Sequence, residues 1–249
     1  MENAATLEGK CCLVTGGSRG LGLAICKAFA REGAKVAFTY SSDDADADDA
    51  KAQIAESGIE PLVFKGSVTD AKHARETIKT LIKAWGQLDV LVNNAGVTQI
   101  LPIALLEEED WDLVMDVNVK GPYLFSRFAL RHMIKKRSGH ILNIGNFSSE
   151  RMIESPVHFA ASKSALRGFT EALACEVGRY NVQVNLLSPG LLDVGLSTML
   201  PQHRVDEYLE QSSFGRLGTV EEVAKTVTFL VSGRNRFMTG AKIVLDGGL

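Results

Sequence analysis

Cysteine is scarce in this sequence and is not arranged to bind a metal. The 249 residues include four cysteines, Cys11, Cys12, Cys26 and Cys175, with no C-x-x-C pair and no Cys/His cluster at zinc spacing. Free cysteine is among the most buried residue types, so we expect small core side chains at these positions. The sequence therefore predicts no metal site.

An excess of charge and a long apolar run are also missing. Lys and Arg total 27, Asp and Glu total 30, and the formal net charge is −3, with both signs spread along the chain. Nucleic-acid-binding proteins usually carry a basic patch, which disfavours that class. No apolar run approaches the ~18–20 residues of a membrane span, and residues 1–10 lack the apolar segment of a signal peptide. We expect a cytoplasmic protein without nucleic-acid or membrane partners.

Strand-like and helix-like segments alternate along the chain. Apolar runs predict strands at 11–15, 35–40, 61–66, 88–96, 140–145, 182–190 and 241–248. Helical periodicity predicts helices at 23–33, 45–58, 70–86, 158–178 and 219–232, and a long helical stretch that breaks near Gly121 and Pro122. Strands that are apolar on both faces and joined by helices form parallel sheets. With no linker-like segment, the sequence predicts one α/β domain over 1–249, a doubly wound, seven-stranded parallel sheet.

A glycine-rich turn, T-G-G-S-R-G-L-G at 15–22, joins the first strand to the first helix. Gly16, Gly20 and Gly22 let the backbone approach a pyrophosphate closely, and the N–H groups at the helix start stabilise its charge. The strand before the turn and the helix after it supply the context that this pattern requires. The segment therefore predicts a dinucleotide-binding site.

Further motifs follow in a characteristic order: N-N-A-G at 93–96, Asn118, Lys163, S-P-G at 188–190 and D-G-G at 246–248. Together with the glycine turn they resemble the short-chain dehydrogenase/reductase family, and most closely its 3-oxoacyl-acyl carrier protein reductase branch. The resemblance runs from about residue 7 to the C-terminus. It implies a Rossmann fold, a nicotinamide cofactor and a homotetramer.

The resemblance also assigns cofactor-binding positions: Gly16, Ser18, Arg19, Gly20, Leu21, Gly22, Ser67, Val68, Asn93, Asn94, Ala95, Gly96, Lys163, Pro189 and Gly190. Ser67 stands where the family usually has an aspartate that binds the adenine amine, and it would accept that hydrogen bond more weakly.

The choice between NAD and NADP depends on the end of the second strand, where NAD-binding folds place an acid. Tyr40 occupies that position, Ser41 and Ser42 follow, and Arg19 adds a positive charge from the glycine turn. These residues predict NADP(H). The acidic run that begins at Asp43 and Asp44 opposes a bound phosphate, and we expect it to be a solvated helix start.

The family reduces a carbonyl group with a tyrosine as general acid. In the family a lysine lowers the pKa of that tyrosine, a serine holds the carbonyl oxygen and an asparagine supports a proton-relay water. The lysine and the asparagine map to Lys163 and Asn118. The tyrosine position, four residues before the lysine, is Phe159, and the serine position, thirteen residues earlier still, is Asn146. Asn146 can still donate a hydrogen bond to an oxygen, whereas Phe159 has no proton to give.

Substitute acids are few in this segment. His158 titrates near neutrality but would face the site only at an irregular helix start, and otherwise we expect it on the surface. Ser148 and Ser149 are poor acids, and we expect Glu150 and Glu154 to be solvated.

Two interpretations of function remain open. The first is an NADP-dependent reductase with a non-standard active site, acting on a carbonyl or a conjugated enoyl group of an acyl or polyketide-like substrate. The second is a catalytically impaired cofactor-binding subunit, paired with an active homologue, or a redox-sensing regulator. An introduced Tyr→Phe change is a third explanation, which the second change at Asn146 disfavours.

The segment 191–218 is expected to form a small substrate lid, apolar around Leu196, Met199 and Leu200, with Arg204 nearby.

Overall fold

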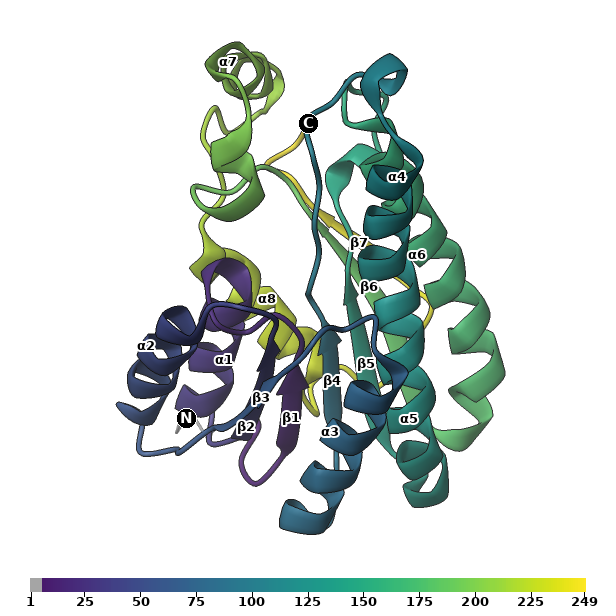
Figure 1. Ribbon diagram of the computed structural model, residues 1–249. Coiled ribbons are helices and arrows are strands. Elements are labelled where there is room, and N and C mark those ends of the chain that lie inside the picture. Colours follow the sequence, from purple (N-terminus) through teal and green to yellow (C-terminus); the bar gives the residue numbers. More distant parts are fainter. Residues whose placement is uncertain (1–5) are drawn as a thin grey trace.

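The computed structural model describes residues 6–249, except for the side chain of Leu196. Seven strands form one sheet in the order β3-β2-β1-β4-β5-β6-β7, and all paired neighbours are parallel (Figure 1). The strands are β1 Cys11–Val14, β2 Lys35–Tyr40, β3 Leu62–Lys65, β4 Val90–Asn93, β5 Gly139–Ile144, β6 Val182–Pro189 and β7 Lys242–Leu245. The predicted fold class is confirmed.

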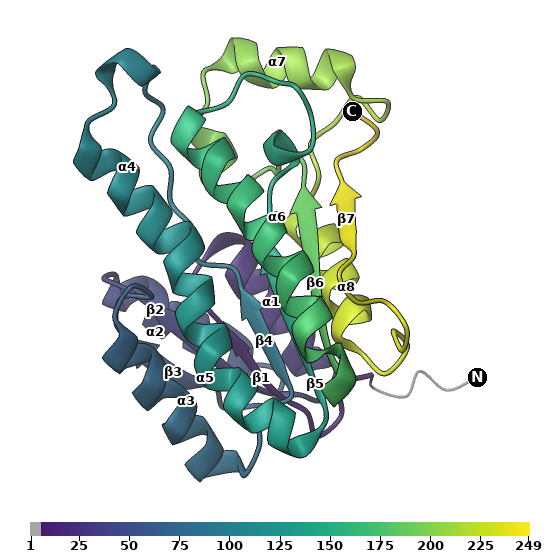
Figure 2. The same ribbon diagram turned by 90° about the vertical axis from the view of Figure 1, so that its right-hand side faces the viewer.

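Helices cover both faces of the sheet. Helices α1, α2 and α8 lie on one face, and α3, α5 and α6 lie on the other (Figures 1 and 2). The helices are α1 Gly20–Arg31, α2 Asp44–Ala55, α3 Ala71–Trp85, α4 Glu108–Met115, α5 Gly121–Lys136, α6 Val157–Val177, α7 Gln202–Gln211 and α8 Val220–Val231. Within residues 6–249, no helix is both long enough and apolar enough to cross a membrane.

Strand β1 shows why its sequence forms a central strand. Alternate side chains point to opposite faces, so Cys12 and Val14 pack under α1 and α8 while Leu13 packs under α3 and α5. Both faces are covered, which is why the strand is apolar throughout.

Three cysteines are buried as expected, but Cys175 is exposed on α6, so the prediction for that residue is wrong.

The expected break at Gly121 and Pro122 does not occur. Helix α4 continues through a wide π-helical turn, Asp116–Lys120, directly into α5. Pro122 follows this wide turn at the start of α5, and the chain stays helical through it although proline has no N–H to donate. The first helix also begins earlier than predicted, at Gly20. The end of the glycine turn is therefore already helical.

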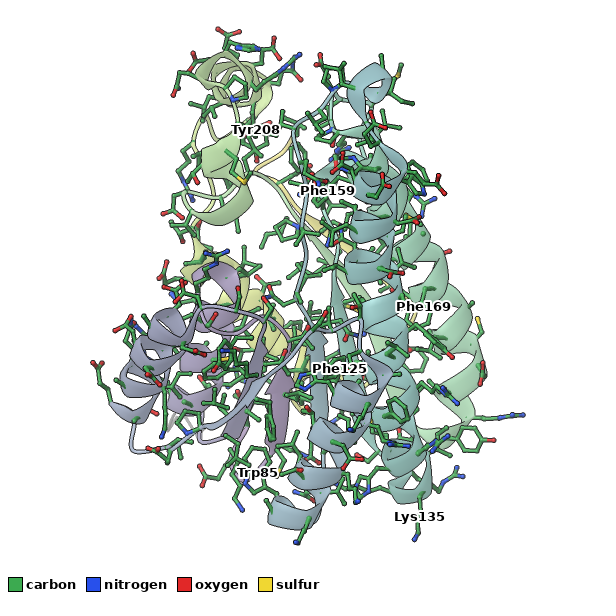
Figure 3. All side chains as sticks on the ribbon, viewed as in Figure 1. Trp85, Phe125, Lys135, Phe159, Phe169 and Tyr208 are labelled. Carbon is green, nitrogen blue, oxygen red and sulfur yellow. The ribbon has the colours of Figure 1, made fainter. Side chains whose placement is uncertain are left out.

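The order of the strands reverses at the centre of the sheet. Strand β1 pairs with both β2 and β4, so the chain leaves the centre in opposite directions on the two sides. Ligands of doubly wound folds bind at such a point, beyond the carboxyl ends of the strands. Phe159 and Tyr208 lie toward this end of the molecule, whereas Trp85 and Lys135 lie toward the other (Figure 3).

Candidate active site

The glycine turn is shaped by backbone constraints that side chains would violate. Gly16 and Gly20 have φ values of 65° and 53°, which favour glycine. A Cβ atom on Gly22 would lie 2.0 Å from the carbonyl oxygen of Gly16. The start of α1 therefore packs directly on the turn, and its N–H groups face the space where a phosphate would lie.

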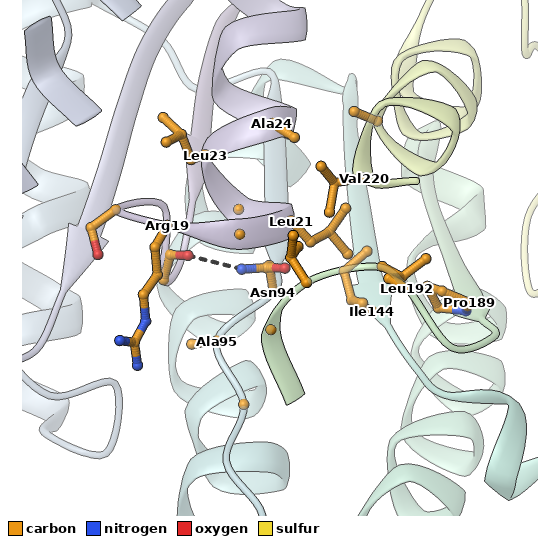
Figure 4. Close-up of a pocket in the computed structure, with 18 of the residues that line it drawn as sticks. Arg19, Leu21, Leu23, Ala24, Asn94, Ala95, Ile144, Pro189, Leu192 and Val220 are labelled. Atoms are coloured by element: carbon orange, nitrogen blue, oxygen red, sulfur yellow. Dashed lines mark hydrogen bonds between the residues drawn. The ribbon is translucent and has the colours of Figure 1, made fainter. Parts of the chain in front are cut away.

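Loops after β1 and β4 are tied together beside this turn. The Asn94 amide donates to the carbonyl oxygens of Thr15 and Gly16, each at 3.0 Å. Figure 4 marks one hydrogen bond of this amide with a dashed line. The Thr15 hydroxyl oxygen accepts hydrogen bonds from the backbone N–H groups of Asn94 and Ala95. These bonds fix the floor of the crevice at the point where the strand order reverses.

One cavity of about 1080 Å³ runs from the glycine turn to the predicted catalytic segment. At the catalytic end its wall includes Asn146, Phe159 and Lys163. Most predicted cofactor positions also line it: Gly16, Ser18, Arg19, Gly20, Leu21, Gly22, Tyr40, Ser41, Ser67, Val68, Asn94, Ala95, Gly96, Pro189 and Gly190. Ser42, Asn93, Asn118 and His158 are not part of its wall.

The end of the cavity near Tyr40 carries more charge than the sequence reasoning recognised. The Tyr40 hydroxyl donates to Asp44 at 2.7 Å, and the ammonium of Lys65 contacts the other oxygen of Asp44 at 2.7 Å. Arg19 lies 3.7 Å from Asp46. Asp43 caps α2 by accepting from the backbone N–H of Asp46, which confirms the expected acidic helix start.

Asn118 belongs to the π-helical turn and is buried behind the cavity wall. Its amide donates to the carbonyl oxygen of Val97 and to the Ser162 hydroxyl, both at 3.0 Å, and its oxygen accepts from the Val97 N–H at 2.9 Å. These three bonds use the side chain to join the loop after β4 to α6. Asn118 thereby holds the part of α6 that carries Lys163 in place against the loop after β4.

Lys163 is buried, and its ammonium donates to the carbonyl oxygen of Ile144 at 2.8 Å. Burial disfavours the charged form and lowers the Lys163 pKa to about 8. The nitrogen lies 5.6 Å from the centroid of the Phe159 ring and close to Gly96, where a Cβ atom would stand 3.5 Å from it. An ammonium has three donors, so two remain for groups in the cavity.

The orientation of the Asn146 amide is fixed by the chain that follows it. Its side-chain oxygen accepts from the backbone N–H of Ser148 at 2.9 Å. A backbone N–H can only donate, so the Asn146 side-chain oxygen faces Ser148 and the amide nitrogen points the other way. Within residues 6–249 that nitrogen makes no hydrogen bond. The wall of the cavity that includes Phe159 thus also contains a neutral donor.

Two expectations about this segment are wrong. His158 is fully buried rather than on the surface, and its Nε2 lies 3.1 Å from the Gln99 side-chain oxygen. Glu150 is buried rather than solvated: only 2% of its side chain is exposed, and Lys242 and Arg167 pair with it at 2.7 and 3.7 Å. These partners come from α6 and β7, far away in sequence. Glu154 is exposed as expected and pairs with Arg204.

The segment 191–218 is anchored by a small apolar cluster. Tyr208 of α7 packs edge-on against Phe147, with ring centroids 5.3 Å apart, and its hydroxyl donates to the Asp246 carbonyl oxygen. Leu200 packs against this cluster, whereas Met199 is exposed and lines the cavity. The side chain of Leu196 lies outside the described part of the chain.

Among the described residues, no group of His, Cys, Asp and Glu side chains is placed to hold a metal ion.

Comparison with known proteins identifies the family to which this chain is similar. A family model described as Enoyl-(Acyl carrier protein) reductase matches residues 16–249. The chain is 36% identical over 244 residues to the 3-oxoacyl-[acyl-carrier-protein] reductase FabG of Thermotoga maritima, covering 98% of each chain. It is 35% identical over 244 residues to the FabG of Pseudomonas aeruginosa, again with 98% of each chain covered.

Solved structures give the same answer. A short-chain dehydrogenase/reductase from Serratia marcescens superposes with a TM-score of 0.91 at 35% identity, over 98% of both chains. A short chain dehydrogenase from Burkholderia cenocepacia, solved in complex with NADP, superposes with a TM-score of 0.91 at 33% identity and the same coverage. The strand order, the glycine turn and these similarities agree: the chain belongs to the short-chain dehydrogenase/reductase family of oxidoreductases.

Proposed function

We propose that this protein is an NADP(H)-dependent reductase with a non-standard active site. Its substrate would be an acyl or polyketide-like compound that carries a carbonyl or conjugated enoyl group. The observation that carries the proposal is one cavity that joins the glycine turn to Asn146, Phe159 and Lys163. The acyl-carrier-protein substrates named for the relatives support this substrate class.

The residues present fit a dinucleotide. The close approach of Gly22 to Gly16 leaves the backbone open toward a pyrophosphate, and the tied loops of Thr15 and Asn94 form a floor beneath it. Tyr40, Ser41 and Arg19 would hold the adenosine end, and Lys163, Pro189 and Gly190 the nicotinamide end. When bound, the cofactor supplies a hydride.

Asn146 would bind the substrate oxygen. Its amide nitrogen is a donor held in place by the bond between its own oxygen and Ser148. A preorganised donor stabilises negative charge that develops on an oxygen during the reaction. A neutral amide can do this without giving up a proton.

Phe159 determines which reaction this site favours. A ketone that accepts a hydride leaves an alkoxide, which needs a proton at once, and the Phe159 ring has none to give. A conjugated enoyl group that accepts the hydride at its β-carbon instead spreads the negative charge to an enolate oxygen, where hydrogen-bond donors suffice until solvent supplies a proton to the α-carbon. Asn146 and the Lys163 ammonium are such donors, so the residues favour reduction of the conjugated C=C bond.

The second candidate function is a cofactor-binding subunit or redox-sensing regulator. The observation that favours it is also Phe159, because loss of a general acid typically costs ~10²–10⁴-fold in rate. The glycine turn and the buried Lys163 would serve cofactor binding equally well in a protein without turnover.

We expect NADPH to bind at least about tenfold more tightly than NADH, because Arg19 supplies a cation near Tyr40 and no acid follows the second strand directly. Arg19→Ala should narrow this difference, measured by fluorescence titration. Arg75→Ala, on the exposed surface of α3, is the matched control and should leave both affinities unchanged. Equal or reversed affinities in the parent would contradict the cofactor assignment.

Restoring the family residues should restore ketone reduction. In Phe159→Tyr the new hydroxyl would lie within the electrostatic reach of Lys163, which lowers the phenol pKa. Combined with Asn146→Ser, we expect a gain of ~10²-fold or more on a β-ketoacyl thioester with NADPH. The rate of NADPH oxidation measures it.

The parent protein separates the two candidate functions in the same assay. Turnover of a conjugated enoyl substrate, lost in Lys163→Ala while the fold persists, supports the reductase. An NADPH-binding parent that turns over nothing in a broad carbonyl and enoyl panel supports the binding subunit. A double variant that also stays inert would show that Phe159 is not what limits ketone reduction.

We further propose a homotetramer, with association with an active homologue as the alternative. Large apolar side chains are exposed on α4 and at the starts of α5 and α6: Trp111, Leu113, Tyr123 and Val157. Exposed apolar groups of this size are typical of subunit contacts. Light scattering should give four times the mass of one chain, and a monomer at all concentrations would refute the proposal.

A further inference from the structure

A second lysine stands at the end of the cavity where Tyr40 lies. The parallel register of β2 and β3 places Lys65 directly beside Tyr40, although 25 positions separate them in the sequence. The Lys65 ammonium lies 6.0 Å from the centroid of the Tyr40 ring. Lys65 is not part of the cavity wall, but about half of its side chain is exposed, so it is free to change direction.

The cations at this end are paired with carboxylates of one helix. Asp44, at the start of α2, holds the Lys65 ammonium at 2.7 Å and also accepts from the Tyr40 hydroxyl. Asp46, two residues further along α2, lies 3.7 Å from Arg19. Both ion pairs are exposed to solvent, and exposed pairs contribute little to stability, typically ~0–1 kcal/mol. Little free energy is therefore lost when either cation leaves its carboxylate for a more highly charged anion.

A nucleotide phosphate is such an anion. It carries more charge than one carboxylate and presents several acceptor oxygens. NADP differs from NAD by a phosphate on the adenosine ribose, which the fold directs to the end of the second strand, where Tyr40 stands. A phosphate there would meet the N-terminus of α2, and the unpaired N–H groups of a helix start favour anions.

We propose that Lys65 is a specificity-determining residue for the 2′-phosphate of NADP and that Asp44 is its internal competitor. In the free protein Asp44 holds the lysine. On binding, the phosphate takes the place of the carboxylate as the partner of Lys65, while Asp44 keeps the Tyr40 hydroxyl. This inference rests on the proposed use of NADP(H).

The charges of the pair agree with this geometry. The hydrogen bond to Asp44 raises the Lys65 pKa, and the bond from Lys65 lowers the Asp44 pKa, so both groups are ionised at neutral pH. The lysine is a cation ready for a phosphate, and the carboxylate opposes that phosphate until the two exchange partners.

The first test replaces the lysine by an uncharged side chain of similar length. We expect Lys65→Met to weaken NADPH binding ~5–30-fold and to leave NADH binding unchanged, since an exposed charge-assisted bond to phosphate is lost. Lys65→Arg should retain the preference. Lys51→Met is the matched control, because Lys51 is also half-exposed and paired with a carboxylate, Glu60, at 2.9 Å. Fluorescence titration of the purified protein with each nucleotide measures the affinities.

The second test removes the competitor. Asp44→Asn keeps an acceptor for the Tyr40 hydroxyl but removes the negative charge, so NADPH should bind ~2–5-fold more tightly while NADH is unaffected. Circular dichroism melts establish that each variant is folded. The two nucleotides serve as controls for each other, because a variant that merely damages the cavity weakens both equally.

The outcomes separate this inference from the proposed function. A parent that prefers NADPH, together with a Lys65→Met variant that keeps the full preference, overturns the role of Lys65 and leaves the cofactor assignment standing. A parent without preference overturns both. An equal loss for NADPH and NADH in Lys65→Met would show that Lys65 supports the cavity and does not recognise the phosphate.

Discussion

Strand β4 lies beside β1, although β2 and β3 separate the two strands in the chain. This crossing sends the loops after β1 and β4 to the same edge, where Thr15, Gly16 and Asn94 bond to one another. The floor of the cavity, the approach of α1 to the glycine turn and the position of Gly96 beside Lys163 all depend on that junction. A cofactor site follows from the sheet topology first and from individual side chains second.

At the other end of the cavity, the proposed function assigns the substrate contacts to residues that differ from the serine and tyrosine that the family resemblance implies. Asn118 ties the loop after β4 to α6, and Lys163 is held by Ile144. The cavity wall at this end includes a donor without an acidic proton, Asn146, and an aromatic ring, Phe159. The buried carboxylate of Glu150, paired with Lys242 and Arg167, secures the turn that follows Asn146. This combination suits stabilisation of an enolate oxygen better than proton delivery to an alkoxide.

The sequence predicted the sheet and the glycine turn because both depend on local pattern: apolar runs of strand length, and glycines between a strand and a helix. It failed where partners come from distant segments. Glu150 looked solvated because Arg167 and Lys242 are far away in sequence, and Lys65 was overlooked because only the β2–β3 register brings it to Tyr40. Cys175 on α6 was assigned to the core by residue type alone, yet its position on the helix faces outward. The π-helical turn at Asn118 has no local signature that separates it from an ordinary helix.

A crystal structure of the protein with NADP⁺ and a conjugated enoyl thioester tests the central claim most directly. The account predicts that the thioester oxygen lies within hydrogen-bond distance, ~2.7–3.2 Å, of the Asn146 amide nitrogen, with the Phe159 ring beside it and no acidic side chain except the Lys163 ammonium in contact. The conjugated carbon should face the nicotinamide. A substrate oxygen held by another acidic side chain, or an Asn146 amide turned away from the bound thioester, would contradict it.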